Sequence, residues 1–254
     1  MGLKEATISG KQECSIFGLI HADIGVGKST LAASMPAPYI FDAEESTSAL
    51  DVDRCVPETY DELLETLCLF RDETHEYKTV IIDTIDHVEK MTVSAACKEH
   101  GVNSPADKSY GVVWQTADTK FKQLILGLKG LRARGFNVLL LAHSKTINYT
   151  HPLGQVYDKI IPDLRDKQKP SASTTGLIMS LPRFIGYMHR PILTTENKEA
   201  SGFSKKYKAT VAQNSVLSCA PHAAYEAKND MGLEADIVIP KENGWAAVQA
   251  AVKQ

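Results

Sequence analysis

The segment Ala22-Asp23-Ile24-Gly25-Val26-Gly27-Lys28-Ser29 decides the fold. It matches the phosphate-binding loop pattern G-x4-G-K-[ST], except that alanine stands at the first position. Glycines in such a loop let the backbone come close to the phosphates, so that successive N–H groups and the start of the next helix point at the anion. Gly25 and Gly27 meet this requirement. Ala22 adds a β-carbon to the entry turn, which a negative φ at that residue would allow.

Each position of the loop has an expected task. We expect the backbone from Asp23 to Thr30 to contact the phosphates, Lys28 to neutralise the β- and γ-phosphates, and the Ser29 hydroxyl to bind Mg²⁺. The flanking pattern is the one that such a loop needs, because an apolar strand over residues 15–20 precedes it and a helix over residues 28–35 follows it. The sequence therefore predicts a nucleotide site for ATP and Mg²⁺.

Strand-like and helical patterns alternate over the first 145 residues. Apolar strands are expected at residues 39–41, 79–83 and 137–143, and helices with one apolar stripe at about 60–71 and 110–134. Such alternation is typical of βαβ units, so we predict an α/β fold with a mainly parallel central sheet flanked by helices.

The chain after Ser144 has a different character, with five prolines between residues 152 and 191 and polar turns. Residues 183–188, 191–195 and 208–212 are predicted as antiparallel strands. A closing helix is expected over residues 244–252, with Trp245, Val248 and Val252 facing inward. We predict one domain over residues 1–254, with a core at about 12–145 and a C-terminal extension of the sheet at about 146–254.

Composition limits the class of protein. Apolar residues make up 43% of 254 positions, no run approaches the length of a membrane span, no basic-then-apolar leader opens the sequence, and the five cysteines are scattered. We expect a cytoplasmic protein with reduced thiols and no membrane partner. The net charge of −3 argues against coating of nucleic acid by bulk attraction.

The charge is unevenly distributed along the chain. Residues 36–76 hold twelve acidic and two basic residues, whereas residues 183–208 hold six basic and two acidic ones. Two interpretations stay open: two solvated faces of opposite sign, or a side of the molecule that binds a polyanion.

Asp83 ends the apolar run Thr79-Val80-Ile81-Ile82-Asp83. A carboxylate at the carboxyl edge of a parallel sheet can hold Mg²⁺ through water beside the phosphate loop. The alternative is that Asp83 caps the helix that begins near His87. We favour the metal role because the acid follows a buried strand.

Two further polar residues follow predicted strands. Glu44 comes after the strand at 39–41 and could orient or deprotonate the water that attacks the γ-phosphate; the alternative is one more surface acid. His143 ends the strand at 137–143 and could sense the γ-phosphate by hydrogen bonding; the alternative is a satisfied core histidine.

Several segments together resemble the RecA-like recombination ATPases, and among them the small phage-encoded ATP-binding proteins that act as single-strand annealing recombinases. Phe41-Asp42-Ala43-Glu44 is similar to the segment with the catalytic glutamate, Val80-Ile81-Ile82-Asp83-Thr84 to the Walker B strand, and Leu141-Ala142-His143-Ser144 to the strand that senses ATP. The resemblance implies a RecA-like P-loop NTPase with Lys28, Glu44 and His143 in catalysis.

The same resemblance implies a place and partners. It suggests a bacterial host cytoplasm, a ring or filament of identical subunits, single-stranded DNA as ligand and a single-strand DNA-binding protein as a further partner. The segment from Tyr225 to Leu233 is similar to a C-terminal segment of the phage proteins, but Asp230 stands where arginine is usual. Lys228 is then the candidate cation for a neighbouring subunit's nucleotide, or else a surface lysine.

The segment from Ser144 to Ser173 mixes basic and aromatic residues, as single-strand binding requires. The basic ones are Lys145, Lys159, Arg165, Lys167 and Lys169, beside Tyr149 and Tyr157. Three aspartates in the segment reduce the excess to two positive charges, so a plain solvated loop stays an alternative. Lys205, Lys206 and Lys208 form a second candidate set.

Two other functions compete with a DNA-dependent ATPase. A small-molecule kinase usually needs an arginine-rich lid over the phosphates, and no such segment is visible between Asp83 and Asn137. A non-hydrolysing module that binds ATP only to stabilise an assembly would not need a carboxylate at Glu44. Glu44 therefore favours hydrolysis.

Overall fold

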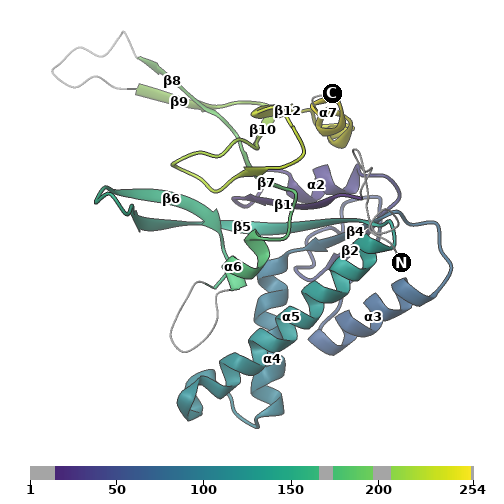
Figure 1. Ribbon diagram of the computed structural model, residues 1–254. Helices are drawn as coiled ribbons and strands as arrows, with labels where there is room; N and C mark the ends of the chain where they lie inside the picture. Colours follow the sequence, from purple (N-terminus) through teal and green to yellow (C-terminus); the bar gives the residue numbers. More distant parts are fainter. Residues whose placement is uncertain (1–14, 166–173, 197–206, 253–254) are drawn as a thin grey trace, which may run out of the picture.

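The computed structural model describes residues 15–165, 174–196 and 207–252. One sheet runs through its centre in the order β12-β10-β7-β1-β5-β4-β2-β3, and β11 and β6 pair with β7 and β5 (Figure 1). A separate two-stranded ribbon is formed by β8 and β9.

The strands and helices have the following bounds. The strands are β1 Phe17–Ala22, β2 Pro38–Asp42, β3 Asp53–Cys55, β4 Thr79–Asp83, β5 Asn137–Thr150, β6 Val156–Pro162, β7 Phe184–His189, β8 Ile192–Glu196, β9 Tyr207–Val211, β10 Ser215–Ser218, β11 Lys228–Asn229 and β12 Asp236–Ile239. The helices are α2 Lys28–Ala33, α3 Tyr60–Asp72, α4 Ile85–Glu99, α5 Val112–Ala133, α6 Thr174–Met179 and α7 Gly244–Ala250, with short 3-10 turns η1 Pro105–Asp107 and η2 Ser109–Gly111.

The centre of the sheet is parallel, as the alternating sequence pattern predicts. From β7 through β1, β5, β4 and β2 to β3, every neighbouring pair is parallel. The residues of β4 are buried from end to end, because helices cover both faces of the sheet and leave no polar side. The α/β class with a mainly parallel sheet is therefore confirmed.

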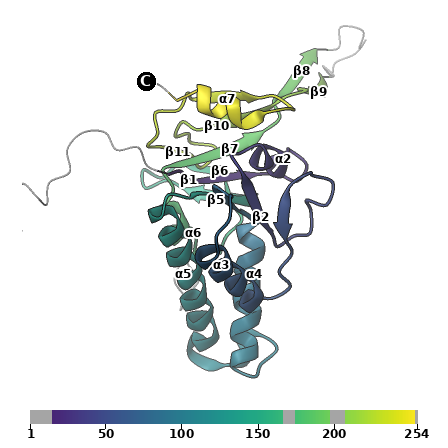
Figure 2. The same cartoon turned by 90° about the vertical axis from the view of Figure 1, so that its right-hand side faces the viewer.

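Helices cover the two faces of the sheet in separate layers (Figure 2). The face covered by α3, α4 and α5 buries Leu63, Val88 and Phe121 against strand residues such as Phe41 and Ile82. The opposite face is covered by α2 and α7, whose buried residues are Leu31, Trp245 and Val248. Burial of these apolar stripes is the main force that holds each helix to the sheet.

The C-terminal part differs from the sequence prediction in two respects. The strand expected at 183–188 is β7, and it is antiparallel to β10 but parallel to β1, because it inserts beside β1 in the sheet. The pair β8 and β9 is antiparallel, as predicted. Val252, expected to face inward, lies after the end of α7 and is 39% exposed, so that detail was wrong.

β5 is longer than the predicted strand. Its first half lies in the core, and its second half forms a hairpin with β6 that extends away from the sheet's centre (Figure 1). No helix among the described ranges combines the length and apolar character that a membrane crossing needs.

Candidate nucleotide-binding site

The phosphate loop lies between β1 and α2, as the motif requires. Gly25 and Gly27 adopt φ values of 77° and 106°, which residues with a side chain rarely adopt. Ala22 is the last residue of β1, is fully buried and lies outside the left-handed region. The alanine at the first motif position is therefore compatible with the extended backbone that enters the loop.

Lys28 begins α2 and folds back over the loop. Its Nζ donates to the carbonyl oxygens of Ala22 and Asp23, both at 3.3 Å, and the residue is only 7% exposed. Burial lowers the pKa of Lys28, while the charges of Asp83, Glu44, Asp86 and Asp23 raise it. The acids around the site thus favour the charged form of this lysine.

Asp83 ends β4, and β5 separates that strand from β1. The residue is 1% exposed, and neither carboxylate oxygen has a hydrogen-bond partner among the described residues. Burial raises the pKa of Asp83 to about 6; the nearby Ser29 hydroxyl opposes this shift without completing a hydrogen bond of ordinary geometry. The cap of α4 is Thr84, not Asp83.

An unsatisfied buried carboxylate beside a hydroxyl fits a divalent cation. Within the described part of the chain, no group of three or more His, Cys, Asp and Glu side chains could hold a metal. A Mg²⁺ site made of Ser29 and Asp83 would therefore be completed by phosphate oxygens and water, which Mg²⁺ commonly retains. The two predicted metal ligands lie together, Ser29 in the first turn of α2 and Asp83 at the end of β4.

Glu44, His143 and Asp86 converge at the same edge. His143 Nε2 lies 3.4 Å from Glu44 Oε1, and His143 Nδ1 lies 3.0 Å from Asp86 Oδ2. The backbone N–H of His143 also donates to Asp86 Oδ1 at 3.0 Å. Since an ionised carboxylate only accepts, Nδ1 carries the proton and Nε2 faces Glu44.

Asp86 was not among the residues selected from the sequence. It lies in the first turn of α4 and is 2% exposed. An acid in the first turn of a helix ordinarily indicates only a favourable interaction with the helix dipole. The contact with His143 depends on how α4 packs beside β5, and no local pattern carries that information.

A rigid turn presents Glu44. Asp42 is 1% exposed and accepts three hydrogen bonds: from the backbone of Ser46 at 3.0 Å, and from the backbone and hydroxyl of Thr47 at 2.9 and 2.6 Å. The Ala43 N–H donates to the carbonyl of Asp83 at 2.7 Å. These bonds fasten both ends of the turn, so the position of Glu44 is determined by the backbone that precedes and follows it.

A cavity of about 630 Å³ opens where these groups meet. Its lining consists of Asp23, Ile24, Glu44, Asp86, His87, Lys90, His143, Ser144 and Asp163. It has the size of a small-molecule site and places Glu44 and His143 beside the start of the phosphate loop. A second hollow of about 290 Å³ lies against α2, lined in part by Thr30, Met188, Arg190 and Asn214.

His21, two residues before the loop, forms a buried polar link. Its Nε2 donates to the Glu226 carbonyl at 2.8 Å, and its Nδ1 accepts from the Ser144 hydroxyl at 2.9 Å. Burial lowers the pKa of His21 to about 4, an effect that the hydrogen bond to Glu226 opposes and the charge of Lys28 reinforces. A neutral His21 thus connects β1 with the residues that follow His143.

Three of the residues expected to contact DNA, Lys145, Lys159 and Arg165, make contacts within the described part of the protein. Lys145 Nζ donates to the Leu164 carbonyl at 2.5 Å and lies 3.3 Å from Asp163. Lys159 Nζ pairs with Glu226 at 2.6 Å. Lys167, Lys169, Lys205 and Lys206 lie outside the described residues, and for Lys208 only the backbone of β9 is described.

Arg165 lies in a largely buried cluster. Its side chain is 11% exposed, pairs with Asp118 and stands over the Trp114 ring at 4.5 Å. Its backbone N–H donates to Glu89 at 3.0 Å, and Thr174 donates to the same carboxylate. The structure thus gives Arg165 an internal role in fastening this segment to α4 and α5.

The structure also shows the contacts of Tyr149, Tyr157 and Lys228, which the sequence analysis singled out. Tyr149 and Tyr157 are paired across the β5–β6 hairpin with ring centroids 5.4 Å apart, and Lys159 stands over Tyr149 at the same distance. Lys228 donates to the Pro182 carbonyl at 2.9 Å and pairs with Asp230 at 2.8 Å.

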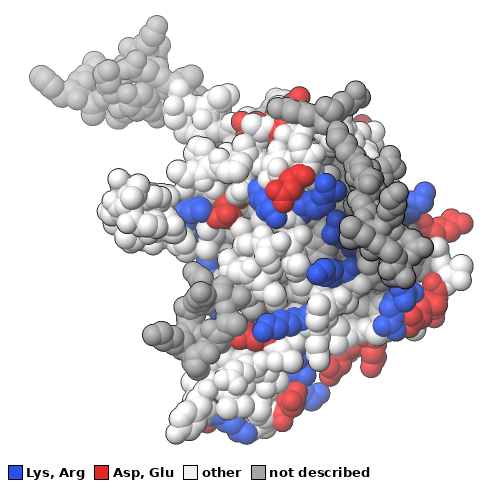
Figure 3. Space-filling view, in the orientation of Figure 1, with Lys and Arg blue, Asp and Glu red and all other residues white. Residues whose placement is uncertain are grey.

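Acidic and basic side chains are interspersed on the face shown in Figure 3, which has no continuous basic surface among its described residues.

Four features together define a P-loop nucleotide-binding protein. They are the glycine loop, Lys28, the buried Asp83 carboxylate without a hydrogen-bond partner among the described residues, and Glu44 at the edge of a parallel sheet. Residues 16–229 match the AAA_24 family, which is described as an AAA domain. The chain therefore belongs to the AAA_24 family of AAA domains, and its fold class is the one that the sequence predicts. No curated protein gives a significant match.

Solved structures with a similar course of the chain include two archaeal proteins. One is a KaiC-like protein, PH0186, from Pyrococcus horikoshii OT3, with 10% identity, a TM-score of 0.41 and coverage of 89% of this chain and 91% of that one. The other is the flagellar accessory protein FlaH from Methanocaldococcus jannaschii, with 11% identity, a TM-score of 0.36 and coverage of 89% and 85%.

Proposed function

We propose that the protein binds ATP and hydrolyses it to ADP and phosphate. The observation that carries this proposal is the convergence of Glu44 and His143 on the cavity beside Lys28. A module that only bound nucleotide would need Lys28 and the loop N–H groups, but not a carboxylate held against a histidine by a fastened turn.

The residues of this chain divide the chemistry as follows. The N–H groups of the loop and the ammonium of Lys28 hold the phosphates and stabilise the charge that develops on them. Glu44 orients the attacking water and accepts its proton. His143, with Nδ1 bound by Asp86, presents Nε2 toward Glu44 and the terminal phosphate. Magnesium held by Ser29 and Asp83 would neutralise phosphate charge when bound.

The hollow against α2 suits the nucleoside. It begins at Gly27 and Thr30, directly behind the loop, and continues past Met188 to the polar side chains of Arg190 and Asn214. An apolar wall with a few polar groups is typical of a site for a planar base. We place the base and ribose there, so that the triphosphate runs along the loop toward Glu44.

Single-stranded DNA and a second copy of the chain are the partners that we propose from the resemblance to phage annealing recombinases. The hairpin with the adjacent, half-buried Tyr149 and Tyr157 supports the DNA proposal, because aromatic rings can stack on unpaired bases. The same proposal includes a ring or filament of identical subunits and a single-strand DNA-binding protein as a further partner. It also places the protein in the cytoplasm of a bacterial host.

ATP turnover measured with and without a single-stranded oligonucleotide tests both parts. We expect hydrolysis in the presence of Mg²⁺ and stimulation by the oligonucleotide. Absence of turnover under both conditions, with ATP still bound, would favour the non-hydrolysing module. For DNA contact, Lys167→Ala with Lys169→Ala should flatten the salt dependence of oligonucleotide binding, while Arg165 is left intact because of its internal contacts.

A further inference from the structure

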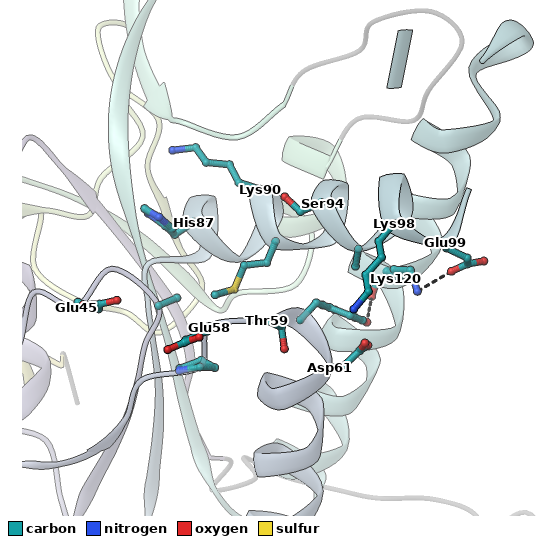
Figure 4. Close-up of a pocket in the computed structure, with 15 residues that line it drawn as sticks. Glu45, Glu58, Thr59, Asp61, His87, Lys90, Ser94, Lys98, Glu99 and Lys120 are labelled. Atoms are coloured by element: carbon teal, nitrogen blue, oxygen red, sulfur yellow. Dashed lines mark hydrogen bonds and ion pairs between the residues drawn. The ribbon is translucent and has the colours of Figure 1, made fainter. Parts of the chain in front are cut away.

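A third cavity lies beside the nucleotide site and has no part in the chemistry described above. It has a volume of about 820 Å³ and lies between the start of α3 and one face of α4 (Figure 4). We call it the α3–α4 cavity and define it by Glu45, residues 57–61, the α4 face from His87 to Glu99, and Lys120.

The floor of the α3–α4 cavity is apolar. Ala43 and Tyr60 are buried, and Met91 and Ala95 are half-buried beside them. An apolar floor of this kind can contact any ligand that has an apolar side chain. The charged side chains at the rim of the cavity therefore determine which ligand binds.

Charges of opposite sign line the two walls of the cavity. Glu58 and Asp61 stand on the α3 side and Lys98 projects from α4 toward them, whereas Lys90, at the other end of the α4 lining, extends away from α3 (Figure 4). None of these four side chains has an ion-pair partner within the described ranges, and the same holds for Glu45. In contrast, Lys120 is paired with Glu99 at 2.9 Å.

The spacing and the balance of charge restrict the ligand. Lys90 and Lys98 are eight residues apart on one helix, a rise of about 12 Å, which about four residues of extended chain would span. The lining contains four acidic and three basic residues, so a polyanion such as a nucleic acid gains no net attraction. A ligand with both signs and an apolar part between them is complementary to these walls.

We propose that the α3–α4 cavity binds a short extended peptide segment of a partner protein. A basic side chain of the segment pairs with Glu58 and Asp61, an apolar side chain packs on the floor, and an acidic side chain pairs with Lys98. Desolvation over the apolar floor makes these charge pairs stronger than ordinary pairs at a surface.

The cavity also contacts the turn that holds the proposed catalytic glutamate. Ala43 and Glu45 line the α3–α4 cavity, whereas Glu44 between them lines the nucleotide cavity. Glu45 adopts a φ of 57°, in the left-handed region. Because Glu44 and Glu45 are adjacent in one turn, a peptide that displaces Glu45 also displaces Glu44. This second step rests on the proposed hydrolysis of ATP.

A selection from a random 12-residue peptide library on the full chain tests the binding step. We expect enriched peptides to combine a basic, an apolar and an acidic residue within about four positions. Ser94→Trp fills the cavity from an exposed position of α4, and Lys98→Glu reverses one wall; each should weaken the enriched peptides at least tenfold. Lys122→Glu, an exposed change of the same charge on α5, is the matched control and should leave binding unaltered.

Three results would overturn the binding step. One is enrichment of peptides without the mixed pattern. A second is equal affinity of enriched peptides for the wild-type chain and the Ser94→Trp variant when both bind ATP and melt at the same temperature. Displacement of the peptide by oligo-dT would also overturn it, since the site would then take a nucleic acid.

Turnover of ATP with saturating peptide tests the coupling separately. A change of at least twofold in kcat with unchanged ATP affinity supports it, and an unchanged kcat refutes it. Peptide affinity is measured without any hydrolysis, so loss of the proposed ATPase function and loss of the peptide site give different results.

Discussion

The Asp86 carboxylate binds both the backbone N–H and the ring Nδ1 of His143, each at 3.0 Å. One buried acid on α4 thereby fixes the end of β5 and the orientation of the imidazole at the same time. The ring cannot turn without losing a charge-assisted hydrogen bond, so Nε2 stays directed toward Glu44.

Asp86→Asn should lower ATP turnover about tenfold or more with little loss of ATP affinity. The asparagine oxygen can still accept from the His143 backbone, but its amide then faces Nδ1 as a donor and favours the opposite ring tautomer. Single-turnover hydrolysis measured beside ATP titration checks this. The exposed Asp51→Asn serves as control, and equal turnover in both variants would remove Asp86 from the mechanism.

Lys28→Ala should abolish nucleotide binding at ordinary concentrations. Removal of a buried cation from phosphate costs about 2–5 kcal/mol, which is at least a 30-fold loss of affinity at about 1.4 kcal/mol per factor of ten. Titration with a fluorescent ATP analogue measures it. An affinity equal to that of the wild type would refute the phosphate-loop assignment.

Glu44→Gln should keep ATP binding and reduce hydrolysis by about a hundredfold, since the amide keeps the shape and loses the base. The neighbouring Glu45→Gln is the matched control, because Glu45 faces the α3–α4 cavity and not the nucleotide. Wild-type turnover in Glu44→Gln would exclude Glu44 as the base.

The raised pKa of Asp83 predicts that the free energy of unfolding depends on pH in the mildly acidic range. Its folded pKa of about 6 lies above the ordinary value of 3.8, so its contribution is favourable below about pH 4 and is lost as the pH rises through 6. Asp83→Asn should therefore raise the free energy of unfolding at pH 7.5, by at most about 3 kcal/mol, and much less at pH 4. Denaturant melts at both pH values without nucleotide measure the difference; an equal effect at both would contradict the raised pKa.

The lowered pKa of His21 predicts the opposite dependence of the free energy of unfolding on pH. Its folded pKa of about 4 lies below the ordinary 6.5, so its contribution is present above pH 6.5 and is lost as the pH falls toward 4. The component amounts to about 3 kcal/mol from the size of the shift. His21→Gln should remove this component from the pH profile of the free energy of unfolding. Parallel profiles for the variant and the wild type would show that the pKa of His21 is the same in the folded and the unfolded state.

The nucleotide loop and the central strands could be predicted from the sequence because each depends on contiguous residues. The loop needs Gly25, Gly27 and Lys28 at fixed spacing, and a strand buried on both faces, such as Thr79–Asp83, needs a continuous apolar run. The neighbourhood of Ser29, Asp83, Glu44 and His143 also followed, since the carboxyl ends of parallel strands share one edge of the sheet.

Only the tertiary structure decided which side chains meet across distant elements. Asp86 reaches His143 because α4 packs beside β5, and Arg165 faces Asp118 because its segment returns to α5; both contacts join residues far apart in sequence. The parallel pairing of β7 with β1 is of the same kind, since an apolar strand carries no signal for its neighbour's direction. Local periodicity determines which residues are buried, whereas packing between elements determines which polar groups become partners.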